Sequence, residues 1–210
     1  MPGRSGSQYP SCRTLLDPGR ESSGNDDTVS DVDAITFQEP PITGDETEQL
    51  LGILDRTRSV LAWKCGGLDA AGLRTTLGPS AVTLGGLLKH MARVEADSFL
   101  WKLSGSRPTP PWDTVEWAWE WGSAADDTPE ELLTLWQAAV ERSRASVAEA
   151  LTHGDLNQPV HIGNDGEHAN LRRLVLDMID EYARHNGHAD LIRESIDGLV
   201  GEDPPGRDEG

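Results

Sequence analysis

The chain has 210 residues, and 18 Lys and Arg against 36 Asp and Glu give it a formal net charge of −18. A chain this acidic repels nucleic-acid phosphates and anionic lipids, so we expect no nucleic-acid and no membrane partner. It has neither the ~20 apolar residues of a transmembrane helix nor an apolar segment behind its N-terminal arginines, as a secretory signal would require. With only two cysteines, Cys12 and Cys65, it is predicted to be a reduced, cytoplasmic protein.

Both ends of the chain differ in composition from its middle. Residues 1–33 contain Gly, Ser, Pro, Asp and Arg in no periodic order and almost nothing to bury, so we predict a disordered extension there. Residues 201–210 are polar and rich in Pro and Gly, and they are predicted to form a disordered tail. The folded domain is therefore expected within residues 34–200.

Four segments of this domain space their apolar residues as amphipathic helices do, and no segment is a convincing strand. The first runs from about residue 45 to residue 64, and Gly66 and Gly67 follow it as a stop signal. The second opens at Thr83, a predicted N-cap, and ends near Gly105.

The third segment has the clearest start signal, because residues 128–131 read Thr-Pro-Glu-Glu, a capping box with Pro at the first helical position. The fourth begins near Asn170 and ends at Asp197 and Gly198, where Gly suits the left-handed residue after a helix. Four helices of roughly 20 residues predict an all-α fold, a four-helix bundle.

The connection over residues 107–127 is long for a bundle, and it contains Trp112, Trp117, Trp119 and Trp121. Long ordered loops are often functional, so this connection could cover one end of the bundle. Alternatively, the rings simply bury the loop against the helices. The alternation of the last three tryptophans is also compatible with a short extended segment.

Three polar side chains fall on faces that should be buried. His90 shares a face with apolar neighbours on the second helix, and His185 lies within the apolar stripe of the last helix. Glu181 precedes His185 by four residues, so the two side chains can reach one point in space. Since a carboxylate directed into a bundle needs a neutralising partner, these three residues are predicted to bind a divalent metal.

Other interpretations of the polar residues stay open. A single histidine on an apolar face is often a hydrogen-bonded core residue, and the whole set could serve a purely structural bundle. His188 could be a further ligand, a support for a ligand or a substrate contact, and Tyr182 is a candidate for the last two roles. The remaining histidines are expected at the surface: His153, His161 and His168.

Two stretches carry a resemblance to a known family. VTLGGLLKHMARVE at residues 82–95 resembles a helix of the DinB-like bundle superfamily, and LRRLVLDMIDEYARHNGHADLIRESIDG at residues 171–198 resembles its last helix. The likeness covers roughly residues 40–198. It is most similar to an actinobacterial branch of unknown function that includes the mini-circle protein family.

The resemblance implies a four-helix bundle that holds a divalent metal through one side chain of its second helix and two of its last. Those positions are His90, Glu181 and His185 in this chain. Many relatives have three histidines there, and the glutamate is similar to the mycothiol-dependent maleylpyruvate isomerase branch. This chain departs from the family at one position, because relatives often have a histidine where it has Asp177. Asp177 could therefore support a ligand or contact the substrate.

Two imidazoles and one carboxylate leave coordination positions free, which is typical of a catalytic metal site. Zinc is the expected metal, and Fe, Ni or Mn fit the same ligands. By analogy with the family, we expect an enzyme that activates a low-molecular-weight thiol, mycothiol, for S-transfer to a small electrophile or for its isomerisation. Its partners would be that thiol and the electrophile, and a homodimer is compatible with this. The alternative is a non-catalytic metal- or ligand-binding bundle in stress response.

Overall fold

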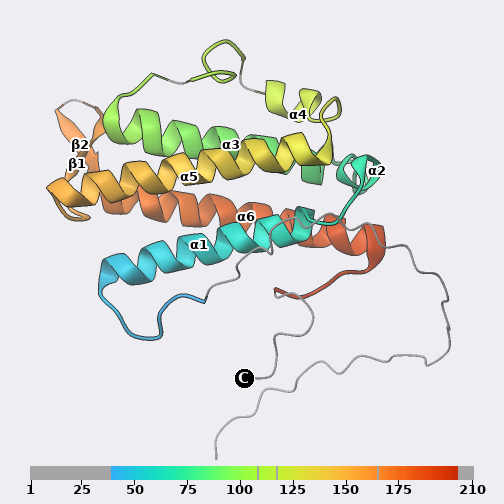
Figure 1. The fold of residues 1–210 in the computed structure, drawn as a ribbon, viewed down its shortest axis with the longest axis horizontal. Helices are drawn as coiled ribbons and strands as arrows, with labels where there is room; N and C mark the ends of the chain where they lie inside the picture. The colour runs from blue at the N-terminus through green and yellow to red at the C-terminus, as the bar shows by residue number, and fades with distance from the viewer. Residues whose placement is uncertain (1–38, 108, 117, 165, 203–210) are drawn as a thin grey trace, which may run out of the picture. The chain divides into compact units, whose positions relative to one another are not determined.

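The computed structural model describes residues 39–202 except 108, 117 and 165. The predicted extension at residues 1–33 lies outside the described residues, and so does the tail from residue 203 onward. Four long helices lie side by side, and a small hairpin stands at one end of them (Figure 1). This mainly all-α fold confirms the prediction, with these helix bounds: α1 Glu46–Cys65, α3 Leu84–Ala96, α5 Pro129–His153 and α6 Leu171–Asp197.

The predicted helix ends are formed by the residues that signalled them. The Thr83 side chain accepts a hydrogen bond from the backbone N–H of Gly86 at 3.0 Å, which begins α3. Thr128 and Glu131 form the reciprocal capping box that begins α5. Gly198 ends α6 in the left-handed conformation, with φ of 78°. Local chemistry therefore determines these boundaries.

A π-helical segment, η1 (Asp97–Lys102), continues α3. In an α-helix, residues five apart point about 140° away from each other. The wider turn of a π-helix brings such residues together, and Asp97 and Lys102 form an ion pair of 2.8 Å. Because π-helical turns often occur at functional sites, this segment is relevant to the pocket described below.

Four short elements were not expected from the sequence. Strands β1 (Pro159–Asn164) and β2 (Glu167–Asn170) form an antiparallel hairpin, which is too short and too poor in alternating apolar residues to be predicted. Helix α2 (Ala70–Leu73) spans only four residues. Helix α4 (Trp119–Ser123) lies within the Trp-rich connection, so the alternative of an extended segment was wrong for Trp119 and Trp121, and Trp117 lies outside the described residues.

A buried ion pair crosses the apolar core. The guanidinium of Arg58 on α1 donates to both oxygens of Glu95 on α3, at 2.8 and 2.7 Å, and the two residues are 4 % and 0 % exposed. The hydroxyl of Tyr182 on α6 donates to the same carboxylate at 2.7 Å, and the indole of Trp136 on α5 donates to that hydroxyl at 3.0 Å. One carboxylate therefore connects all four long helices.

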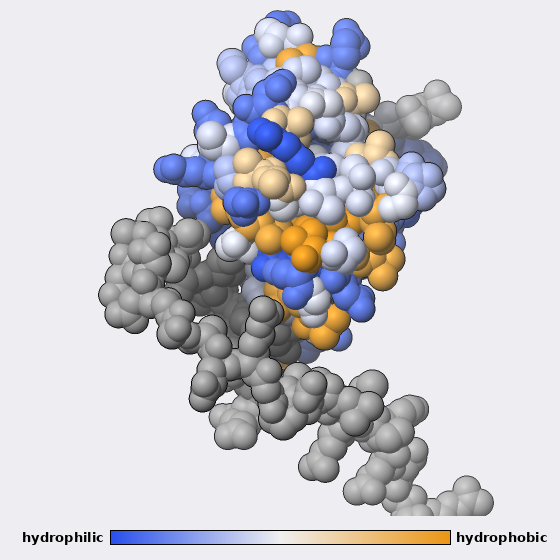
Figure 2. Space-filling view, turned by 90° about the vertical axis from the view of Figure 1, so that its right-hand side faces the viewer, coloured by the Kyte–Doolittle hydropathy of each residue, from blue (hydrophilic) through white to orange (hydrophobic). Residues whose placement is uncertain are grey.

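One end of the bundle carries a mixed surface. Viewed from the side of α2, it shows hydrophilic residues with hydrophobic ones gathered over its lower half (Figure 2). Within residues 39–202, as far as the structure describes them, none of the helices has the length and apolar composition that crossing a membrane requires.

Candidate metal centre

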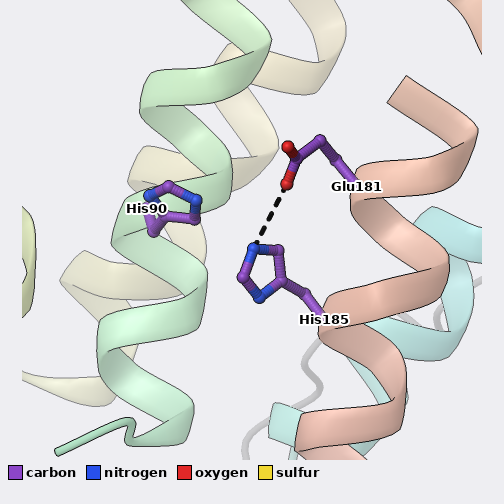
Figure 3. A group of neighbouring side chains, drawn as sticks. All are labelled: His90, Glu181 and His185. Carbon is purple, nitrogen blue, oxygen red and sulfur yellow. Dashed lines mark ion pairs between the residues drawn. The ribbon is translucent and has the colours of Figure 1, made fainter. Parts of the chain in front are cut away.

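The structure brings the three predicted ligands together. His90 comes from α3, and Glu181 and His185 come from successive turns of α6, with their side chains directed toward one another between the two helices (Figure 3). One ligand atom from each residue can be chosen so that all three lie within 4.8 Å of one another. The i, i+4 spacing on α6 and the packing of α6 against α3 produce this cluster.

The three side chains differ in exposure. The side chains of His185 and His90 are 10 % and 16 % exposed, whereas that of Glu181 is 39 % exposed. The argument that Glu181 is directed into the interior and needs a neutralising partner was therefore wrong, because its carboxylate lies at the edge of the bundle in contact with water. The cluster is closed on the His185 side and open on the Glu181 side.

The imidazole of His185 has a neighbour at each nitrogen. Its Nε2 lies 3.3 Å from Oε2 of Glu181, and its Nδ1 lies 3.3 Å from Nδ1 of His188. Burial, followed by the proximity of His90 and His188, lowers the pKa of His185 to about 4. The ring is therefore neutral near pH 7, and neutral imidazole is the form that binds metals.

The surroundings of His90 include two residues that sequence reasoning missed. Oε1 of Glu120, a residue of α4 that is only 1 % exposed, lies 3.4 Å from Nδ1 of His90. The ring of Trp121 stacks on that of His90, with centroids 4.7 Å apart. Their position in the Trp-rich connection was the available signal, because a long loop that covers the bundle can contribute to a site.

A pocket of about 300 Å³ opens onto the cluster. His90 and Glu181 line it together with the ion-paired Asp97 and Lys102 of η1 and with Ser98. A second pocket, of about 480 Å³, adjoins it, since both are lined by Lys102 and Asp177. The hairpin contributes to the second pocket through Ile162, Gly163, Glu167, His168 and Ala169.

The other predicted site residues occupy different places. Asp177 is exposed, pairs with Arg173 at 2.6 Å, and lines both pockets. His188 is exposed next to His185. Tyr182 is fully buried, its hydroxyl bonds to Glu95 and Trp136, and burial and then Glu95 raise its pKa well above its usual range. The three histidines expected at the surface are exposed: His153, His161 and His168.

The donor atoms of the cluster fit a divalent metal. Two imidazole nitrogens and one carboxylate oxygen, on two rigid helices and close to a pocket, are a donor set that Zn(II) and non-haem Fe(II) accept. Among the described residues, His90, Glu181 and His185 form the group of His, Cys, Asp or Glu side chains that lie close enough together to hold one metal ion.

The fold is a mainly all-α bundle, and a comparison with family models gives the class of protein to which it belongs, the DinB-like family. A family model described as Mycothiol-S-transferase matches residues 49–198, a range that contains all three clustered residues. The chain therefore belongs to the Mycothiol-S-transferase family. This confirms the resemblance to DinB-like, mycothiol-related proteins. No match was found among curated proteins. Membership supports a mycothiol-related enzymatic role in general.

Proposed function

We propose that this protein is a divalent-metal-dependent enzyme that activates mycothiol for S-transfer to a small electrophile or for isomerisation of that electrophile. The observation that carries the proposal is the cluster of His90, Glu181 and His185 beside an open pocket. Family membership supports the identity of the thiol. A purely structural role explains the cluster less well, because polar cross-linking inside the bundle is already supplied by the Arg58–Glu95 pair.

In this proposal the three clustered side chains bind the metal beside the pocket. His90 and His185 donate ring nitrogens, and Glu181 adds an oxygen and a negative charge. Because the pKa of His185 is lowered to about 4, protons do not compete for its nitrogen at neutral pH. When bound, the metal supplies the positive charge that favours the thiolate form of a thiol.

The pocket provides room for the two substrates. Its polar lining, which includes Asp97, Ser98 and Lys102 of η1 and Asp177 and Asp180 of α6, suits a polar thiol rather than a purely apolar ligand. The adjoining pocket beside the hairpin extends this space. We infer that the thiol occupies the end near His90 and Glu181 and that the electrophile approaches from the open side.

Metal analysis of the purified protein tests the proposal. We expect about one divalent metal per chain, as a site with one set of three ligands requires. His90→Ala and His185→Ala should lose the metal, whereas the exposed His153→Ala should retain it. Full metal content in both ligand variants would contradict the assignment.

Turnover of an electrophile panel, with and without mycothiol, then tests the enzymatic part. The expected result is electrophile consumption that requires both mycothiol and metal, and that cysteine at the same concentration does not support. Metal binding without thiol-dependent turnover would instead favour the non-catalytic metal-binding bundle. A protein that binds no metal would favour the structural bundle.

A further inference from the structure

A buried carboxylate from the Trp-rich connection faces His90. Glu120 is 1 % exposed, and burying a carboxylate is costly unless polar partners compensate for the lost water. Its Oε2 accepts a hydrogen bond from Nη1 of Arg93 at 3.1 Å, and its Oε1 lies 3.4 Å from Nδ1 of His90. Both partners belong to α3, three residues apart, so the charge of Glu120 acts on the face that carries the candidate ligand.

The neighbouring indole restrains the plane of the His90 ring. The rings of Trp121 and His90 are 27° from parallel and 4.7 Å apart. Gly86, one helical turn before His90, makes this approach possible, because a Cβ there would lie 2.9 Å from Cε3 of Trp121. A larger residue at position 86 would displace the indole, which gives the second glycine of the 82–95 motif a physical role.

We propose that Glu120 is a positioning residue for the candidate metal centre: it accepts the Nδ1–H of His90 and thereby keeps Nε2 free for the metal. A neutral imidazole has one N–H and one lone pair, and a carboxylate can only accept. Nδ1 must then carry the proton. Metal-ligating histidines commonly donate their other N–H to a carboxylate, which fixes the tautomer and makes the ligand more basic. This inference rests on the proposed function for the presence of the metal.

The connection has anchors on α3 that do not involve Glu120. Lys89 pairs with Asp127 and lies over the ring of Trp119, 4.1 Å from its centroid. Arg93 also donates to the backbone carbonyls of Glu116 and Val115, at 2.6 and 3.3 Å. A variant at position 120 should therefore keep the connection docked, and its effect on His90 can be measured separately from folding.

The tautomer of His90 in the metal-free protein is the first test. Long-range ¹H–¹⁵N NMR of the ring should show the Nδ1–H form in the wild-type chain and a mixture of both forms in Glu120→Ala. The measurement needs no metal and no activity, and it is made on variants that are folded. A wild-type His90 in the Nε2–H form would overturn the inference even if the variant failed to fold.

Zinc affinity, measured by competition with a chromogenic chelator, is the second test. Glu120→Gln should weaken binding by about 10- to 100-fold, the usual loss when such a partner is removed, and Glu120→Asp should recover part of it. The control Lys89→Met removes a different anchor of the same connection, so its affinity should stay within about twofold. Equal losses in Glu120→Gln and Lys89→Met would show that docking of the connection, and not the carboxylate, is responsible.

The two proposals fail in different ways. A wild-type chain that binds no zinc overturns the proposed function and, with it, a role of Glu120 toward the metal. A wild-type chain that binds zinc, together with a Glu120→Gln variant of equal affinity, overturns only the role of Glu120.

Discussion

Two adjacent carboxylates on α6 both line the 300 Å³ pocket, but they have different partners. Glu181 lies 3.3 Å from Nε2 of His185, whereas Asp180, one helical step of about 100° away, is exposed and pairs with Arg184 at 3.3 Å. Chemical identity is nearly the same at the two positions. The phase of the helix alone places one of them in the cluster.

Substitutions at Glu181 and Asp180 should therefore have different effects on metal affinity. Glu181→Gln keeps the shape but removes the charge, so metal affinity should fall by at least about 10- to 100-fold, the loss that changing even an outer partner causes. Glu181→His should retain binding, because a histidine fits the same i, i+4 geometry. Asp180→Asn should change metal affinity much less, because Asp180 pairs with Arg184 and is not one of the three clustered residues, although it lines the same pocket. Metal titration into the three metal-free variants gives the order, and an equal loss in Asp180→Asn would contradict the assigned phase.

Cys65 should be chemically inert in the folded protein. It is 1 % exposed, and burial raises the pKa of its thiol to about 12, against a smaller opposing effect of Arg193. At pH 8 only about one thiol in 10⁴ would be ionised, and the thiolate is the reactive form. In a Cys12→Ser variant, we expect a thiol reagent to label Cys65 only after denaturation.

The same raised pKa of Cys65 has a consequence at high pH. The unfolded thiol, with its ordinary pKa near 9, loses its proton first, so this contribution to stability is present below pH 9 and is lost as the pH rises toward 12. Rapid labelling of the folded Cys12→Ser variant at pH 8 would contradict the burial of the Cys65 side chain.

At the scale of elements, Glu95 connects the four long helices. It binds Arg58 of α1 and Tyr182 of α6, and Ser143 of α5 donates to its backbone carbonyl at 3.3 Å. Burial alone would lower the pKa of Arg58, but the Glu95 carboxylate outweighs this and raises it. The carboxylate of Glu95 therefore keeps Arg58 charged inside the bundle.

Removing one partner of this pair should destabilise the whole bundle. Glu95→Gln leaves the guanidinium of Arg58 buried without its main counter-charge, and breaking such pairs costs about 3–5 kcal/mol. The matched control is Glu39→Gln, because Glu39 pairs with Arg56 at 2.9 Å near the surface and such pairs contribute about 0–1 kcal/mol. Urea unfolding of both variants measures the free energies, and similar losses would contradict the importance of burial.

Helix positions were predictable wherever the start and stop signals are local. The side chains of Thr83 and Thr128 begin their helices by accepting hydrogen bonds from nearby backbone N–H groups. Gly198 ends α6 through its own left-handed dihedral angles. The hairpin and α4 were not predictable, because they depend on packing against distant parts of the chain. Trp121, for example, takes its place on α3 only because Gly86 leaves room for it.

At the scale of the whole molecule, residues 1–33 are predicted to be dispensable. They have almost no apolar residues to contribute to a core. A chain that starts near Ala34 should match the full chain in Tm and in metal content, as thermal unfolding and metal analysis would show. A loss of several degrees in Tm would mean that this segment packs against the domain.

The sequence by itself determined the bundle, several helix ends and the Glu181–His185 pair, because periodicity and i, i+4 spacing are properties of neighbouring residues along one helix. His90, on another helix, was grouped with that pair from its place on an apolar face and from the family resemblance. Only the tertiary structure decided that Glu181 lies at an open edge, that Tyr182 serves the buried pair with Glu95, and that Glu120 reaches His90. These contacts join residues 30 or more positions apart. They depend on how helices pack, which periodicity within a single helix does not specify.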